Sequence, residues 1–151
     1  MKCEIMNLKE IKNIGFIGLG VMGSPMCNNL LKNKKWHIIV NDLDNSKEKE
    51  LEKNGASIAK NLNELFNVAD MIITCLPGGD FVREIYLGEK KIASEINPDK
   101  LIIDMSTSQP DLMIELNKLI TKKGSFFADA PIARTRPVSY THLRAHETFF
   151  D

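Results

Sequence analysis

Residues 13–26 read Asn-Ile-Gly-Phe-Ile-Gly-Leu-Gly-Val-Met-Gly-Ser-Pro-Met and carry the strongest structural signal in the chain. The apolar run that ends at Gly18 is typical of a strand, and the residues around Gly23 have helical spacing. A Gly-x-Gly-x-x-Gly pattern in this position, directly after a strand and at the start of a helix, is typical of a dinucleotide-binding turn. Glycine turns also occur for purely structural reasons, so the flanking strand and helix carry the interpretation.

Each of the three glycines has a separate predicted task. Gly18 allows the tight turn from strand to helix, Gly20 lets a diphosphate approach the backbone, and Gly23 lets the helix pack closely on the strand. The free amides of the first helical turn and the helix dipole then face the phosphates. The predicted cofactor-binding residues of this turn are Gly18, Leu19, Gly20, Val21, Met22 and Gly23.

An acidic residue follows at the distance that a dinucleotide site requires. Asp42 lies 19 residues after Gly23, at the end of the second predicted strand. A carboxylate there accepts hydrogen bonds from both hydroxyls of the adenine ribose and repels a 2′-phosphate. Leu43 follows, where an NADP enzyme would be expected to offer a cation. The sequence therefore favours NAD over NADP, with a helix cap or a turn as the alternative role for Asp42.

The rest of the chain alternates short apolar runs with amphipathic stretches. Strands are predicted over 13–18, 36–41, 56–59, 71–75, 101–104 and 125–129. Helices are predicted over 21–33, 44–54, 61–67, 81–87 and 111–122, with a Lys/Glu-rich connection after 87. Strands that are apolar throughout and separated by helices predict an α/β fold with a doubly wound, Rossmann-type parallel sheet.

Composition excludes several classes of function. The 151 residues suffice for one domain, and 20 basic side chains balance 20 acidic ones, so we expect no nucleic-acid partner. Apolar runs are far shorter than a membrane span needs, and charged residues interrupt any secretory signal. Three widely spaced cysteines without a Cys/His cluster indicate reduced thiols in the cytoplasm and no metal site.

Four motifs in order resemble the β-hydroxyacid dehydrogenases, a family that includes the 3-hydroxyisobutyrate and 6-phosphogluconate dehydrogenases and tartronate semialdehyde reductase. The first is the glycine turn. The others are Leu76-Pro77 after a strand, Asp104-Met105-Ser106-Thr107 after the next, and Asp129-Ala130-Pro131-Ile132 after the last. The resemblance spans about residues 13 to 136. Taken without it, the same segments are strand-ending turns and helix caps.

The resemblance implies roles for residues in these loops. Leu76 and Pro77 lie along the cofactor, Thr107 lies near the nicotinamide, and Ser106 contacts substrate. The family commonly continues the last motif with Ser-Gly-Gly; Ala133, Arg134 and Thr135 stand there instead and are the other predicted substrate-binding residues. A guanidinium suits a carboxylate or sulfonate. The alternative for Arg134 is a solvated surface side chain.

The implied reaction is hydride transfer between a nicotinamide cofactor and a small 3-hydroxy acid or its semialdehyde. Alternatives are reduction of another small anionic aldehyde, such as sulfolactaldehyde or succinic semialdehyde, and a nucleotide-binding module without chemistry. A methyltransferase is disfavoured by the Leu76-Pro77 and Ser106-Thr107 matches. In the family the general acid/base is a lysine on a linking helix, followed by a helical second domain and, we expect, homo-oligomeric assembly. We find no catalytic residue within this chain, so we expect it to bind cofactor without turnover.

The last residues of the chain do not continue the pattern. We expect a dinucleotide-binding domain over 1–136, truncated before the helical second domain, and a tail over 137–151 that is not native. The tail resembles one translated reading frame of a common transposase sequencing adapter. The alternative is a divergent natural C-terminus, and resequencing the locus distinguishes the two.

Overall fold

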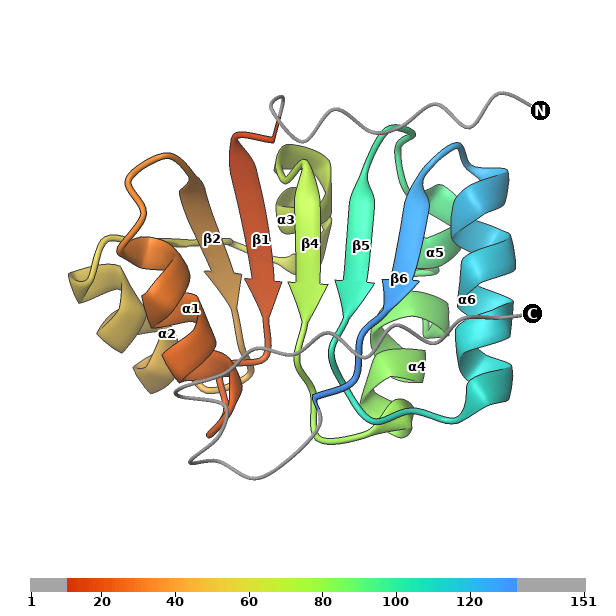
Figure 1. Ribbon diagram of the computed structural model, residues 1–151, viewed down its shortest axis with the longest axis horizontal. Coiled ribbons are helices and arrows are strands. Elements are labelled where there is room, and N and C mark those ends of the chain that lie inside the picture. The colour runs from red at the N-terminus through yellow and green to blue at the C-terminus, as the bar shows by residue number, and fades with distance from the viewer. Residues whose placement is uncertain (1–10, 133–151) are drawn as a thin grey trace.

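The computed structural model describes residues 11–132, which form a six-stranded sheet with helices on both sides (Figure 1). All neighbouring strands are parallel, in the order β3-β2-β1-β4-β5-β6. The strands are β1 (Asn13–Ile17), β2 (His37–Asn41), β3 (Ser57–Ile58), β4 (Met71–Thr74), β5 (Leu101–Asp104) and β6 (Phe126–Asp129). The order turns back between β1 and β4, which is the switch point of a doubly wound sheet.

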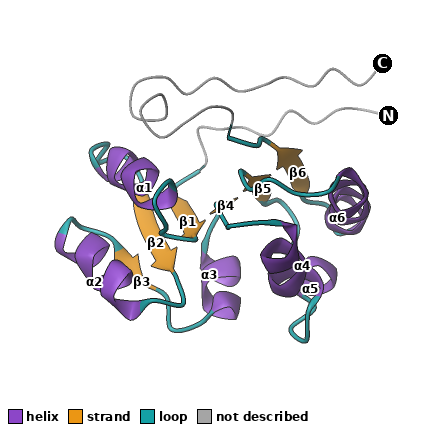
Figure 2. Cartoon of the chain, turned by 90° about the horizontal axis from the view of Figure 1, so that it is seen from below, coloured by secondary structure: helices purple, strands orange, loops and turns teal. Residues whose placement is uncertain are grey.

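In the described part of the chain, six helices connect the strands. They are α1 (Gly23–Leu31), α2 (Asn45–Lys53), α3 (Leu62–Val68), α4 (Gly79–Leu87), α5 (Ile92–Glu95) and α6 (Pro110–Lys122). Figure 2 shows α1 on one side of the sheet and α3, α4 and α5 on the other. The predicted fold class is therefore confirmed.

The sheet divides the interior into two apolar clusters, because successive side chains of a strand point to opposite faces. One cluster joins Phe16 and Val40 of the sheet to Cys27 of α1 and Leu51 of α2. The other joins the opposite face to α3, α4, α5 and α6 and includes Leu116. Strands buried on both faces need apolar residues at every position, which is why the runs were apolar without alternation.

Local signals set most of the helix ends. Asp44 caps α2 by accepting a hydrogen bond from the Ser46 amide, and Gly55 with φ +107° follows the end of that helix, as predicted. Pro110 is the first residue of α6, where a missing amide costs nothing. The prediction was wrong at α5, because a helix of four residues gives too little periodicity to be distinguished from the charged connection in which it lies.

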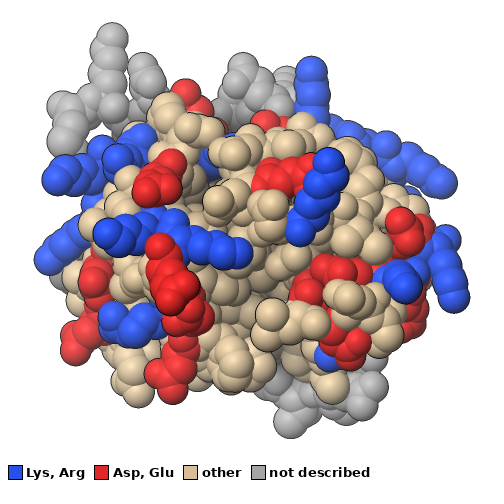
Figure 3. All heavy atoms as spheres, turned by 180° about the vertical axis from the view of Figure 1, so that it is seen from behind, with Lys and Arg blue, Asp and Glu red and all other residues tan. Residues whose placement is uncertain are grey.

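Acidic and basic side chains are interspersed on the face that carries α3 to α6 (Figure 3). Among residues 11–132, no helix is both long and apolar enough to cross a membrane. The predicted tail over 137–151 lies outside the described residues.

Candidate cofactor site

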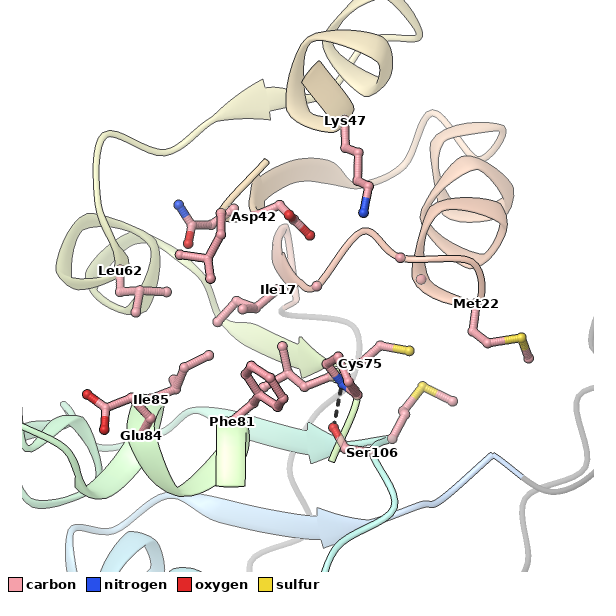
Figure 4. A pocket seen from close by; sticks show the side chains of 18 of the residues that line it. Ile17, Met22, Asp42, Lys47, Leu62, Cys75, Phe81, Glu84, Ile85 and Ser106 are labelled. Carbon is pink, nitrogen blue, oxygen red and sulfur yellow. Dashed lines mark hydrogen bonds between the residues drawn. The ribbon is translucent and has the colours of Figure 1, made fainter. Parts of the chain in front are cut away.

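A cavity of about 700 Å³ opens at the carboxyl ends of the strands, over the switch point (Figure 4). Parallel α/β sheets bind ligands at this edge because strand order reverses there and leaves a crevice. Its walls are the turn after β1, the end of β2 and the loops after β4 and β5. The predicted site residues that line it are Gly18, Gly20, Val21, Met22, Gly23, Asp42, Leu76, Pro77, Ser106 and Thr107.

The three glycines of the turn face different surroundings. Gly18 has φ +94°, and a Cβ there would overlap the Cys75 carbonyl oxygen. A Cβ on Gly23 would overlap the Gly18 carbonyl oxygen, whereas a Cβ on Gly20 would have no atom within 4 Å. Gly18 and Gly23 are therefore required by the fold itself. Gly20 is not, and it borders open space in the cavity, where a ligand can approach its backbone.

The N-terminus of α1 faces this cavity without a cap of its own. Met22 is the N-cap residue and makes no side-chain capping hydrogen bond, and the first turn of the helix contains no acidic residue. The Ser24 hydroxyl instead donates to the Leu19 carbonyl at 2.6 Å and so stabilises the turn. The Ser24 amide donates to the Gly20 carbonyl at 3.0 Å and Pro25 has no amide hydrogen, so the amides up to Gly23 and the positive end of the helix dipole form the site for an anion such as a diphosphate.

Asp42 lies at one end of the cavity and is fixed by backbone groups. Its Oδ2 accepts a hydrogen bond from the Leu19 amide at 2.6 Å, and its Oδ1 accepts one from the Asp44 amide at 2.8 Å. The Asp42 amide donates to Oε1 of the buried Glu48 at 2.9 Å. Asp42 thus takes part in a turn, while the helix cap falls to Asp44, whose hydrogen bonds with Ser46 lower the pKa of that carboxyl.

Leu19 is the one residue of the predicted turn that does not line the cavity. Its side chain is buried in the core, and its amide donates to Asp42. Its contribution to the site is therefore to join the glycine turn to the end of β2.

The loops after β4 and β5 form the opposite wall. The Leu76 amide donates to the Ser106 hydroxyl oxygen at 2.9 Å (Figure 4), so one side chain joins the two loops. Thr107 is exposed on this wall, whereas Ser106 is buried. Burial raises the pKa of the neighbouring Cys75 thiol to about 11, with a further contribution from Asp104.

Several residues of the cavity were not expected from the sequence. Lys47 extends from α2 into the space beside Asp42, and Phe81, Glu84 and Ile85 of α4 lie across from it (Figure 4). These residues belong to helices whose local pattern shows only amphipathic spacing. Lys47 had one signal, since it lies within the first turn of the helix that follows Asp42, but no motif marks it.

The last predicted substrate-binding residues, Ala133, Arg134 and Thr135, lie outside the described residues. The segment before them runs toward the site, because the Ala130 amide donates to the Asp104 carbonyl at 2.8 Å and the Ile132 amide to the Met105 carbonyl at 3.3 Å. Ile132 itself lines the cavity.

Comparison with known proteins shows the family to which the chain belongs. The model for the NAD binding domain of 6-phosphogluconate dehydrogenase matches residues 13–138. The chain belongs to this family. It is an NAD(P)-binding domain, and the resemblance drawn from the four sequence motifs is confirmed.

Two relatives show which enzymes carry this NAD-binding domain. The chain is 38% identical over 120 residues to the mitochondrial 3-hydroxyisobutyrate dehydrogenase of Mus musculus, covering 80% of this chain and 36% of that protein. It is 40% identical over 125 residues to the 3-sulfolactaldehyde reductase of Escherichia coli K12, covering 81% of this chain and 41% of that protein. The chain therefore spans well under half the length of these relatives.

Solved structures agree with the fold of the NAD-binding domain. The 3-hydroxyisobutyrate dehydrogenase of Mycobacterium tuberculosis superposes with a TM-score of 0.75 at 28% identity, over 86% of this chain and 43% of that chain. An imine reductase from Myxococcus stipitatus, solved in complex with NADP+, superposes with a TM-score of 0.74 at 21% identity, over 83% of this chain and 43% of that chain.

Proposed function

We propose that this chain binds NAD and forms the cofactor-binding part of an enzyme that transfers hydride between the nicotinamide and a small 3-hydroxy acid or its semialdehyde. The observation that carries the proposal is the placement of Asp42 beside the glycine turn, with its carboxyl group at one end of the cavity. The adenine ribose would bind there, and the diphosphate would bind at Gly20 and the N-terminus of α1.

The choice of NAD over NADP rests on the charge next to the ribose. Asp42 would accept hydrogen bonds from the 2′- and 3′-hydroxyls, while a 2′-phosphate would meet a like charge. Lys47 lies in the same part of the cavity and would attract that phosphate. We expect Asp42 to affect the choice of cofactor more than Lys47 does. Two backbone amides hold the Asp42 carboxyl group in place, whereas a lysine stem is flexible.

The relatives and the presence of Arg134 support the proposed substrate class. The relatives are named for 3-hydroxyisobutyrate and for 3-sulfolactaldehyde, both small anionic molecules. The guanidinium of Arg134 would bind a carboxylate or a sulfonate through two hydrogen bonds. Either substrate class is consistent with that contact.

Titration of the full chain with NADH and with NADPH tests the cofactor proposal. We expect NADH to bind at least about tenfold more tightly, which corresponds to 1.4 kcal/mol. Tighter binding of NADPH would overturn the role given to Asp42. Binding of neither nucleotide by a chain that melts cooperatively would overturn the assignment of the cavity.

A further inference from the structure

Asp104, at the end of β5, is the centre of a buried polar network that the predicted cofactor contacts do not explain. Its side chain is fully buried, and Oδ1 accepts hydrogen bonds from the Thr74 hydroxyl at 2.6 Å and the Ser106 hydroxyl at 2.7 Å. The Ser106 amide also donates to Oδ1 at 3.3 Å, and the Ser108 hydroxyl donates to Oδ2 at 3.4 Å. Burial of a carboxyl group costs free energy unless the group is hydrogen-bonded, so these hydrogen bonds are what allows Asp104 to be buried here.

The parallel register explains how these residues meet. Thr74 and Asp104 are 30 residues apart in sequence but occupy paired positions on β4 and β5. Both strands end there, and the Met105 amide donates to the Thr74 carbonyl at 2.8 Å. The network therefore lies directly beneath the point at which the chain leaves the sheet to form the cavity wall.

Ser106 carries the network from the core to that wall. Its hydroxyl donates its single proton to Asp104 and accepts from the Leu76 amide, so it fixes the loop after β4 against the loop after β5. Only 2% of Ser106 is exposed. A hydroxyl whose proton is already donated, in a side chain almost wholly covered, is poorly suited to hold a substrate and well suited to hold a loop.

The position of this wall indicates which half of the cofactor it contacts. Asp42 at the end of β2 would hold the adenine ribose, and the glycine turn after β1 would hold the diphosphate. The part of the cavity that remains lies over β4 and β5, where Leu76, Pro77 and Thr107 line it. The nicotinamide half would extend there.

We infer that Ser106, held by Asp104 and Thr74, is a positioning residue that orients the Leu76 and Thr107 loops against the nicotinamide half of the cofactor. This inference rests on the proposed function. It assigns Ser106 an action through the loops, in place of the substrate contact expected from the family resemblance. The adenylate half binds to other elements, so the two halves respond differently when Ser106 is changed.

The Ser106→Ala variant of the full chain tests this, with NADH and ADP as the two titrants. NADH spans both halves of the site, whereas ADP reaches only the ribose and diphosphate part. We expect NADH affinity to fall about tenfold, since the partly buried Leu76 amide loses its acceptor, while ADP affinity stays within about twofold. A ratio of NADH to ADP affinity equal to that of the unchanged chain would overturn the inference.

Ser125→Ala is the matched control. Ser125 is buried to a similar degree, accepts from the Lys100 amide at 3.1 Å and donates to the Asn97 carbonyl at 2.9 Å, so its hydroxyl also bridges two loops. Those loops lie at the amino ends of the strands, away from the cavity. We expect Ser125→Ala to lower the melting temperature without changing the ratio. A change of the ratio as large as that in Ser106→Ala would mean a general loss of stability and would overturn the inference.

Thr74 supplies a second pair of variants should Ser106→Ala fail to fold. Thr74→Val removes the donor to Asp104 and keeps the shape of the side chain, and Thr74→Ser restores the donor. We expect Thr74→Val to lower the ratio of NADH to ADP affinity about threefold, and Thr74→Ser to return that ratio to the value of the unchanged chain. Equal ratios in the two variants would overturn the inference. Failure of the unchanged chain to bind either NADH or ADP would instead overturn the proposed function.

Discussion

The backbone amide of Leu19 donates a 2.6 Å hydrogen bond to Oδ2 of Asp42, although 23 residues separate the two in sequence. The bond joins the middle of the glycine turn to the end of β2. The shape of the turn and the position of the carboxyl group are therefore set together. We expect changes at either residue to affect both the shape of the turn and the position of the carboxyl group in the cavity.

Asp42→Asn should weaken cofactor binding and narrow the preference for NAD. The amide has one acceptor oxygen where the carboxylate has two, and it carries no charge to repel a 2′-phosphate. We expect NADH affinity to fall about tenfold and the ratio of NADH to NADPH affinity to fall with it, measured by titration. Asp44→Asn is the control, because asparagine caps a helix equally well and the same charge is lost two residues away. If the ratio of NADH to NADPH affinity were the same in the unchanged chain, in Asp42→Asn and in Asp44→Asn, the role of Asp42 would be contradicted.

Gly20→Ala should separate ligand binding from folding. Its Cβ has open space in the protein alone but would meet a bound diphosphate. We expect the melting temperature to stay close to that of the unchanged chain, while NADH affinity falls at least about tenfold. A Gly20→Ala variant that binds NADH with unchanged affinity would show that the diphosphate does not lie against Gly20.

Gly18→Ala should differ from Gly20→Ala, because its main effect is a loss of folding stability. Its positive φ and the nearby Cys75 carbonyl oppose any Cβ, so we expect the free energy of unfolding to fall by about 1–3 kcal/mol or more. Gly55→Ala shares the positive φ but has open space and lies far from the cavity, so it isolates the cost of the backbone conformation. A smaller loss in Gly18→Ala than in Gly55→Ala would contradict this account.

Cys75 should react slowly with iodoacetamide at neutral pH even though it lines the cavity. Burial, with a contribution from Asp104, raises the pKa of its thiol to about 11, and the thiolate is the reactive form. In a Cys3→Ser background, mass spectrometry should show Cys75 modified much more slowly in the folded chain than in urea. The rate should rise toward pH 11. Modification at the same rate in both states would contradict the burial of this thiol.

Asp129→Asn should stabilise the fold at neutral pH. Partial desolvation, with a contribution from the neighbouring Asp104, raises the pKa of the Asp129 carboxyl above the ordinary 3.8, although the residue is exposed at the end of β6. The folded chain therefore holds this proton to higher pH than the unfolded chain, and the associated stability, present below pH 3.8, is lost as pH rises through the folded pKa. Since solvent screens much of the effect, we expect a gain of less than about 1 kcal/mol at pH 7 and none at pH 3.5, measured in urea.

Asp99→Asn is the control for that comparison. Asp99 lies before β5, at the opposite end of the sheet, and its positive φ of 63° is one that asparagine adopts readily. We expect the stability of this variant to follow the unchanged chain at both pH values. A gain at pH 3.5 as large as that at pH 7 in Asp129→Asn would show that the effect is not one of charge.

The sequence predicted the glycine turn that lines the cavity more fully than the surroundings of that turn. Gly18, Gly20 and Gly23 act within one turn, so their spacing along the chain reflects their spacing in space. Asp42 was also predictable, because a strand and a helix of ordinary length place it beside that turn. Lys47 and Phe81 were not, since their entry into the cavity depends on how α2 and α4 pack on the sheet.

The sequence by itself determined the alternation of strands and helices, the parallel sheet and the glycine turn that borders the cavity, because all of these depend on local spacing and apolar runs. Only the tertiary structure decided that Ser106, whose hydroxyl donates to Asp104, joins two loops by accepting from the Leu76 amide. That arrangement needs β4 and β5 to lie side by side in register, so that Thr74 meets a carboxyl group 30 residues away. Contacts between distant segments depend on packing, and no local pattern encodes them.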